Sequence, residues 1–176
     1  MTPSQFVGRI LKRIILRPRV KKLNWQQLCS GAVAVREQFE ARIEGETEDS
    51  AAISSGGMTI KEMLAHLAVA NRAIADRLDS LRAGNPGSPN VPDLYPGAEG
   101  KDLKELKAEF DRSWKRLGEA AATPITSLET QKHDFFGPMD AREWVALIAY
   151  HHQYHARQVD RIQRTDEWRR VRGSKF

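Results

Sequence analysis

The sequence predicts an all-α protein: a four-helix bundle with up-down-down-up topology and an extra basic helix at its N-terminus. Three observations predict this fold. Four segments of roughly 20 residues carry apolar side chains at spacings of three and four, the period of an amphipathic helix. Residues typical of helix N-caps precede several of these segments, and no segment alternates convincingly as a strand does. Such helices must bury their apolar stripes against one another, which a bundle of four achieves.

The composition is that of one globular domain. The chain has 176 residues, 40% of them hydrophobic, so it can bury a core without covalent cross-links. The single cysteine, Cys29, excludes a disulfide within the chain and fits a reducing compartment, so we expect a cytoplasmic protein. The longest apolar run, WVALIAY at 144–150, is far too short to span a bilayer.

The positive charge is concentrated at the N-terminus. Residues 1–23 contain seven of the 28 Lys and Arg and no acid, which leaves 21 basic against 23 acidic residues in 24–176. The seven basic residues are Arg9, Lys12, Arg13, Arg17, Arg19, Lys21 and Lys22. We therefore divide the chain into a basic amphipathic N-terminal arm, 1–23, and a bundle, 24–176.

Three roles are open for the arm. Its residues 4–17 carry an apolar helical stripe, which we expect Pro18 to interrupt. The arm would pack on the bundle or on a second subunit of a homodimer, dock peripherally on acidic lipid, or bind nucleic acid. Packing is the favoured role. Nucleic acid is disfavoured because Phe6 is the only aromatic residue among the basic ones.

The first two bundle helices follow the arm directly. One is expected at 25–43, and the segment 45–57 then reads as a loop. Thr59 and Glu62 form a capping box that opens the next helix, which we expect to end near Arg82.

Two irregular stretches flank the third helix, which we expect at 102–122. The segment 84–100 contains four prolines and is long enough to return along a helix, so the second and third helices can be parallel. The segment 123–138 is also expected to be irregular. Asp140 and Glu143 then cap the last helix, whose apolar stripe continues to Ile162.

Three histidines are the candidate metal ligands. His151 and His155 are four residues apart on the apolar stripe of the last helix, so both rings can reach one ion. His66 lies on the second bundle helix, and antiparallel packing of the two helices brings it to nearly the same height. Imidazole is a common ligand of zinc and nickel, and three ligands leave a coordination position open. We expect His152 and His133 to be solvent-exposed or loop residues rather than ligands.

At these residues the sequence resembles a known family. The segments TIKEMLAHL at 59–67, FFGPMDAREW at 135–144 and HHQYHARQV at 151–159 resemble the DinB-like (YfiT-like) superfamily, over about residues 24–164. The resemblance implies an up-down-down-up bundle with a divalent metal, usually zinc or nickel, held by His66, His151 and His155. It also implies that Gln158 corresponds to the glutamine that follows the last ligand in the family. Its members include S-transferases that use bacillithiol, mycothiol or glutathione, and hydrolase-like or isomerase relatives. The basic arm departs from the family pattern.

Other polar and aromatic residues are candidates for the surroundings of the site. Gln158 would orient the ring of a ligand histidine or pack on the helix surface. Tyr154 would line a substrate pocket or belong to the core. Asn71 lies on an apolar face and needs a partner, either across the bundle, which we favour, or in the site.

The chemistry that follows is activation of a nucleophile by the metal. A three-histidine site would ionise a low-molecular-weight thiol for attack on a small electrophile, or lower the pKa of water for hydrolysis. The sequence has no HExxH motif and no carboxylate one turn from the ligands on the inward face of a helix, so no catalytic acid or base is assigned. We therefore expect a metal-dependent thiol S-transferase. The alternatives are a metal-dependent hydrolase and a non-catalytic stress protein that binds a metal or small molecule.

Overall fold

A computed structural model describes residues 3–85 and 98–173. The helices are α1 (Pro3–Leu11), the π-helical segment η1 (Lys12–Leu16), α2 (Arg17–Lys22), α3 (Trp25–Ile43), α4 (Glu48–Ala51), α5 (Ile60–Arg82), α6 (Leu103–Ala121), α7 (Ala141–Ile162) and α8 (Asp166–Gly173). Two short strands, β1 (Gln131–His133) and β2 (Gly137–Met139), precede α7. Most of the segment expected to return along a helix, residues 86–97, lies outside the described residues.

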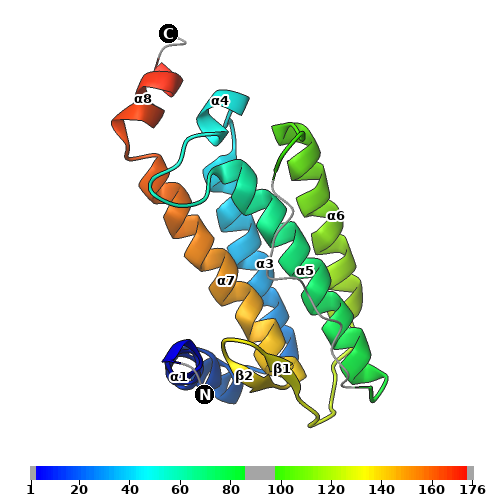
Figure 1. Ribbon diagram of the computed structural model, residues 1–176. Coiled ribbons are helices and arrows are strands. Elements are labelled where there is room, and N and C mark those ends of the chain that lie inside the picture. The colour runs from blue at the N-terminus through cyan, green and yellow to red at the C-terminus, as the bar shows by residue number, and fades with distance from the viewer. Residues whose placement is uncertain (1–2, 86–97, 174–176) are drawn as a thin grey trace.

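The four long helices form the predicted bundle. Figure 1 shows α3 and α7 running in one direction and α5 and α6 in the other, which is the up-down-down-up topology. The helix α5 packs along α6, α3 packs along α7, and α5 also contacts α7. The fold class predicted from the sequence is therefore confirmed, and the contact between α5 and α7 is the one that positions the histidines.

Capping boxes fix where the long helices begin. The side chains of Asn24, Thr59, Asp102 and Asp140 each accept a hydrogen bond from the backbone N–H three residues later. The side chain of that later residue in turn accepts one from the backbone N–H of the cap. Each long helix then buries one face in a continuous apolar core between the four. The largest fully buried side chains are Trp144, Phe39, Phe110, Leu16, Ile60, Met63, Leu64, Leu67, Leu78, Leu81, Leu106 and Leu117.

Pro18 does not interrupt the N-terminal helix, contrary to the prediction. The five π-helical residues of η1 come directly before α2, and Pro18 lies in the first turn of α2. Proline lacks an N–H and its ring crowds the preceding turn of an α-helix, so it is tolerated best at the start of a new helical segment. The wider turn of η1 provides that start, and the arm remains helical to Lys22.

The segment 123–138 is not wholly irregular, which is a second difference from the prediction. Strands β1 and β2 pair antiparallel, with Gln131 opposite Met139. Gly137 has a φ of 75°, a backbone conformation that favours glycine, where the chain turns back. Figure 1 shows this hairpin beside the beginning of α7, at the same end of the bundle as α1. The short helices α4 and α8, also not predicted, lie at the opposite end.

The arm packs on the end of the bundle where α7 begins. Leu16 is fully buried in the core, and Nζ of Lys12 lies 2.6 Å from Oε2 of the buried Glu143 on α7. The guanidinium of Arg142 donates to the carbonyl oxygen of Val20 at 2.6 Å and to that of Leu23. These contacts hold the arm to the N-terminal turn of α7. Within the described part of the chain, no helix has the length and apolar character needed to cross a membrane.

Candidate metal centre

The three candidate ligands converge between α5 and α7. Nε2 of His151 lies 2.8 Å from Nε2 of His66 and 3.1 Å from Nε2 of His155. Each histidine has a ring nitrogen within 4.8 Å of those of the other two. His151 and His155 occupy adjacent turns of α7, and His66 reaches them from α5. The structure thus brings all three sequence-predicted candidates to one point.

The spacing of these nitrogens fits a bound divalent ion. Zinc–nitrogen bonds of about 2.0–2.1 Å, at angles between about 90° and 110°, separate the ligand nitrogens by roughly 2.8–3.4 Å. The two separations from His151, 2.8 and 3.1 Å, lie within this range. Three neutral nitrogen donors are also the ligand chemistry that zinc and nickel accept. The cluster could therefore hold a metal ion with a coordination position left for a substrate.

Gln158 sets the orientation of one of these rings. Nδ1 of His155 lies 2.5 Å from the amide oxygen Oε1 of Gln158, three residues further along α7. Because an amide oxygen only accepts, Nδ1 of His155 carries the proton and Nε2 presents its lone pair to the other histidines. Of the two interpretations of Gln158, orientation of a ligand ring is the one its hydrogen bond supports.

The site keeps its histidines neutral. Burial, and next the positive charge that His155 would carry, lower the pKa of His66 to about 4. Burial also lowers the pKa of His155 to about 4, although its hydrogen bond to Gln158 acts in the opposite direction. For His151, burial and the neighbouring histidines place the pKa well below its usual value. All three are thus unprotonated at neutral pH, the form that binds a cation.

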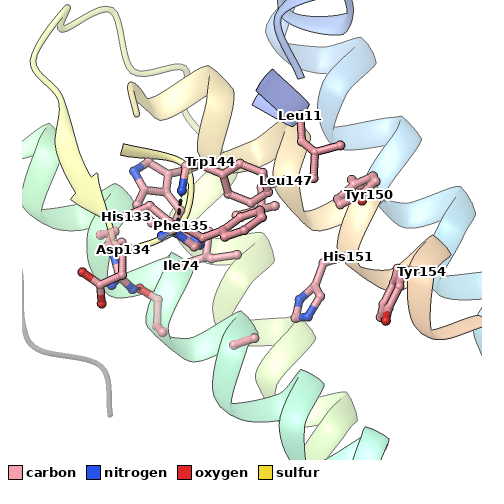
Figure 2. A pocket seen from close by; sticks show the side chains of 14 residues that line it. Leu11, Ile74, His133, Asp134, Phe135, Trp144, Leu147, Tyr150, His151 and Tyr154 are labelled. Atoms are coloured by element: carbon pink, nitrogen blue, oxygen red, sulfur yellow. Dashed lines mark hydrogen bonds between the residues drawn. The ribbon is translucent and has the colours of Figure 1, made fainter. Parts of the chain in front are cut away.

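A mainly apolar cavity of about 380 Å³ opens beside His151. In Figure 2, His151 has Tyr150 and Tyr154 of α7 on one side and the hairpin residues on the other. The lining residues are Leu11, Ala70, Ala73, Ile74, Arg77, His133, Asp134, Phe135, Phe136, Trp144, Leu147, Tyr150, His151 and Tyr154. The cavity therefore adjoins a candidate ligand and is closed at one side by the hairpin and the arm.

Two residues of this cavity were not found by sequence reasoning. Asp134, a carboxylate, lies in the turn between β1 and β2 and lines the cavity together with His151. His133, expected in a loop or exposed to solvent, is half-buried and lines it too. Nδ1 of His133 accepts a hydrogen bond from the backbone N–H of Phe135 at 3.0 Å. The only sequence signal for either was their position just before the cap of α7.

A second, smaller cavity lies on the other side of Tyr154. Its volume is about 280 Å³, and Gln158 and Arg161 contribute polar groups to its lining. Gly56 and Gly57 of the loop before α5 close it. Tyr154 lines both cavities, and its side chain is 47% exposed, so it belongs to the surroundings of the site rather than to the core.

Two other sequence candidates lie away from the cluster. The expectation that His152 is exposed is wrong: it is buried, with Nδ1 2.9 Å from the carbonyl oxygen of Ile148 and its ring 4.9 Å from that of Trp114. His152 follows His151 directly in α7 and therefore points about 100° further round the helix, so it faces α3 and α6 instead of α5. Asn71 donates across the bundle to Oγ of Ser113 at 3.1 Å and lines neither cavity beside the histidines.

Comparisons with known proteins agree with this architecture. A solved structure described as TT2238, a four-helix bundle protein, superimposes with a TM-score of 0.63 and 21% identity, covering 78% of this chain and 98% of that one. At this identity the likeness shows the fold alone. A search of the curated proteins found no match. The family model of the DinB superfamily matches residues 20–159, which include all four long helices and the three histidines but only the end of the arm. The chain therefore belongs to the DinB superfamily.

Proposed function

We propose that this protein is a metal-dependent S-transferase that joins a low-molecular-weight thiol to a small electrophile. The single observation that carries the proposal is the convergence of three neutral imidazoles beside an open cavity. His66, His151 and His155 would hold one divalent ion, zinc or nickel, through their Nε2 atoms. A divalent ion there lowers the pKa of a thiol, so that the nucleophilic thiolate is present at neutral pH.

The two cavities support a reaction with two substrates. The larger one is mainly apolar and suits the body of a small electrophile, whereas the smaller one presents Gln158 and Arg161 to a polar or anionic molecule. Tyr154 lies between them, so molecules bound in the two cavities would meet near His151 and His155. In the reaction, the thiolate sulfur forms a bond to an electrophilic carbon and the leaving group departs with its electron pair. The thiol proton passes to solvent.

The protein's own thiol is not suited to this role. Cys29 lies on α3, where burial raises the pKa of its thiol, and it lines neither of the two cavities next to the histidines. A buried thiol with a raised pKa is a poor nucleophile. The nucleophile would therefore be a small thiol from the surrounding solution, and the cytoplasm, where such thiols are kept reduced, is the compartment we propose.

The proposal is tested by metal analysis and a thiol assay on the same preparations. The protein purified without chelators should contain about one zinc or nickel ion per chain, and His151→Ala should lose it. With a panel of thiols and 1-chloro-2,4-dinitrobenzene, we expect product formation that requires both the ion and a particular thiol. No bound metal would contradict the site, and metal without thiol-dependent turnover would contradict the reaction.

Hydrolysis is the second candidate, because Asp134 lines the cavity beside His151. A carboxylate in the wall of this cavity would act as the general base for attack by water. The two functions are separated by Asp134→Asn assayed with ester substrates and with the thiol panel. Ester cleavage that this substitution abolishes would favour a hydrolase, whereas thiol transfer that survives it would favour the transferase. A metal-loaded protein inactive in both assays would be the non-catalytic binding protein.

A further inference from the structure

The outer face of the N-terminal arm carries an exposed apolar ridge. Its four members, Phe6, Val7, Ile10 and Ile14, are 54%, 49%, 41% and 66% exposed. Among the described residues only three other large hydrophobic side chains are comparably exposed, and Val33, Leu128 and Tyr154 are scattered elsewhere along the chain. Single exposed apolar residues are ordinary, but four neighbours on one helix mark a surface that meets a partner.

The ridge is distinct from the face by which the arm packs on the bundle. Phe6, Ile10 and Ile14 follow at four-residue intervals and therefore lie on one side of the helix. Gly8, Lys12 and Leu16 lie on the opposite side and are buried against the hairpin and α7. The bundle covers only the side with Gly8, Lys12 and Leu16, and it leaves the apolar side exposed.

The charges beside the ridge select an anionic partner. Arg9, Arg13 and Arg17 lie along its flank, all exposed, and residues 1–23 contain no acid. Glu143 of α7 pairs with Lys12, and its carboxylate lies 3.7 Å from Nε of Arg17. Arg9 and Arg13 form no ion pair with any carboxylate among the described residues, so they draw negative charge to this face.

The apolar ridge and its basic flank together distinguish between three kinds of partner: a second copy of the chain, nucleic acid and a lipid bilayer. In a symmetric pair of chains joined through this ridge, the two basic flanks would face each other, which is electrostatically unfavourable. Nucleic acid would bind the arginines through its phosphates but leave the apolar ridge in water. A bilayer with anionic headgroups satisfies both features at once, because its apolar region accommodates the ridge and its headgroups bind the arginines.

We propose that the outer face of the arm docks this protein on membranes that contain anionic lipid. Phe6, Val7, Ile10 and Ile14 would enter the boundary between headgroups and acyl chains, with the helix lying in the plane of the interface. The flanking arginines bind the headgroup phosphates. The contacts of Lys12 and Arg142 keep the bundle attached to the docked helix, so the whole protein is carried to the lipid surface.

Co-sedimentation with vesicles tests this docking. The full-length protein should bind vesicles of phosphatidylcholine and phosphatidylglycerol, bind phosphatidylcholine alone much more weakly, and be released in part by salt. Ile10→Asp with Ile14→Asp should abolish binding because charged side chains do not enter the interface. Arg13→Gln with Arg17→Gln should weaken it by about fivefold for each charge removed.

Leu128→Asp is the matched control, because Leu128 is 91% exposed and lies outside the arm. It should bind vesicles as the unaltered protein does. Thermal unfolding followed by circular dichroism should be nearly unchanged in all these variants, since the substituted side chains are exposed and Glu143, the ion-pair partner of Arg17, keeps its pair with Lys12. Equal binding to neutral and anionic vesicles, or an equal loss with Leu128→Asp, would overturn the proposal.

Two further results would assign the face to another partner and also overturn it. A dimer that the aspartate pair converts to a monomer, in a protein that binds no vesicles, would show that a second copy covers the ridge. Salt-sensitive binding to duplex DNA without vesicle binding would show that nucleic acid does.

Discussion

His155 and Gln158 are joined by a hydrogen bond of 2.5 Å between Nδ1 of the ring and Oε1 of the amide, within one turn of α7. The bond fixes which nitrogen of His155 carries the proton, and so leaves Nε2 as the atom facing His66 and His151. Outer hydrogen bonds of this kind hold the rings of metal-ligating histidines in the orientation that coordination requires.

Replacing Gln158 should therefore weaken the metal site without removing a ligand. For Gln158→Leu we expect the affinity for zinc to fall by about 10- to 100-fold. Gln158→Glu keeps an acceptor for the Nδ1 proton and should retain most of the affinity. Competition with a zinc-binding dye measures both, and equal affinities for Leu, Glu and Gln at this position would contradict the role of the hydrogen bond.

His151 and His152 are adjacent in the chain but should respond oppositely to substitution. His151→Ala removes a ligand and should abolish stoichiometric zinc. His152→Leu should keep it, because that ring packs among Phe39, Phe110 and Trp114 rather than beside His66. The buried exchange is nearly volume-conserving, so we expect a stability change below about 1.5 kcal/mol. Metal analysis and urea unfolding measure the two effects; loss of zinc in His152→Leu would contradict this division.

The stability of the metal-free protein should fall as the pH is lowered from about 6.5 to about 4. The pKa of His155 is lowered by burial from 6.5 to about 4, and that of His152 to about 3. Below pH 6.5 the unfolded chain therefore binds protons that the folded chain does not, and protonation favours unfolding. Each histidine that stays neutral contributes up to about 1.4 kcal/mol per pH unit.

Urea unfolding of the metal-free protein at pH 7 and at pH 5 measures this dependence. His152→Leu lacks one of the titrating groups, so its stability should fall less between the two pH values. If the unaltered protein were equally stable at pH 7 and at pH 5, these rings would have to be protonated in the folded state.

Gly8 should be needed for the arm to pack against the hairpin. A Cβ atom added there would lie 1.9 Å from the carbonyl oxygen of Phe135, and the contact atom is backbone. Gly8→Ala should therefore displace the arm from the hairpin, at a cost of about 1–3 kcal/mol. Gly31→Ala is the control, because nothing lies within 4 Å of its added Cβ in α3, and it should stabilise the protein by about 0.5–1 kcal/mol. Thermal unfolding compares them, and matched melting temperatures would contradict the close contact.

Ala70 offers a way to close the larger cavity while leaving the ligands intact. It lies on α5, one turn after His66, and lines the cavity. Ala70→Leu should fill part of that space, so thiol-dependent turnover should drop at least tenfold while one zinc per chain remains. Ala70→Ser, which changes the volume little, is the control. Full activity in the leucine variant would place the substrate elsewhere.

The helices could be predicted closely because their signals are local. The segment expected at 25–43 is α3 with the same bounds, since an apolar period and a cap specify a helix within the segment itself. The hairpin could not, because three-residue strands are too short to show alternation. The passage of the helix through Pro18 also escaped prediction. It depends on a π-helical turn, and the arm that contains this turn is held by contacts with α7.

The ligand candidates were accessible to sequence reasoning, and the cavity was not. His151 and His155 share a face by spacing alone, and the antiparallel run of α5 and α7 brings His66 to their height. Asp134 lines the same cavity only because the hairpin folds back on α7, which is a tertiary event with no periodic signal. His152 was misplaced because an exposed position was inferred for a residue that the neighbouring helices α3 and α6 enclose.

Consecutive residues of α1 face different surroundings: Leu11 lines the cavity beside His151, and Ile10 is open to water. The thickness of one helix is thus all that separates the cavity from the exterior on that side. Any displacement of the arm changes the volume available to a molecule next to the histidines. The rate of a reaction at those histidines would then depend on what the N-terminal arm contacts.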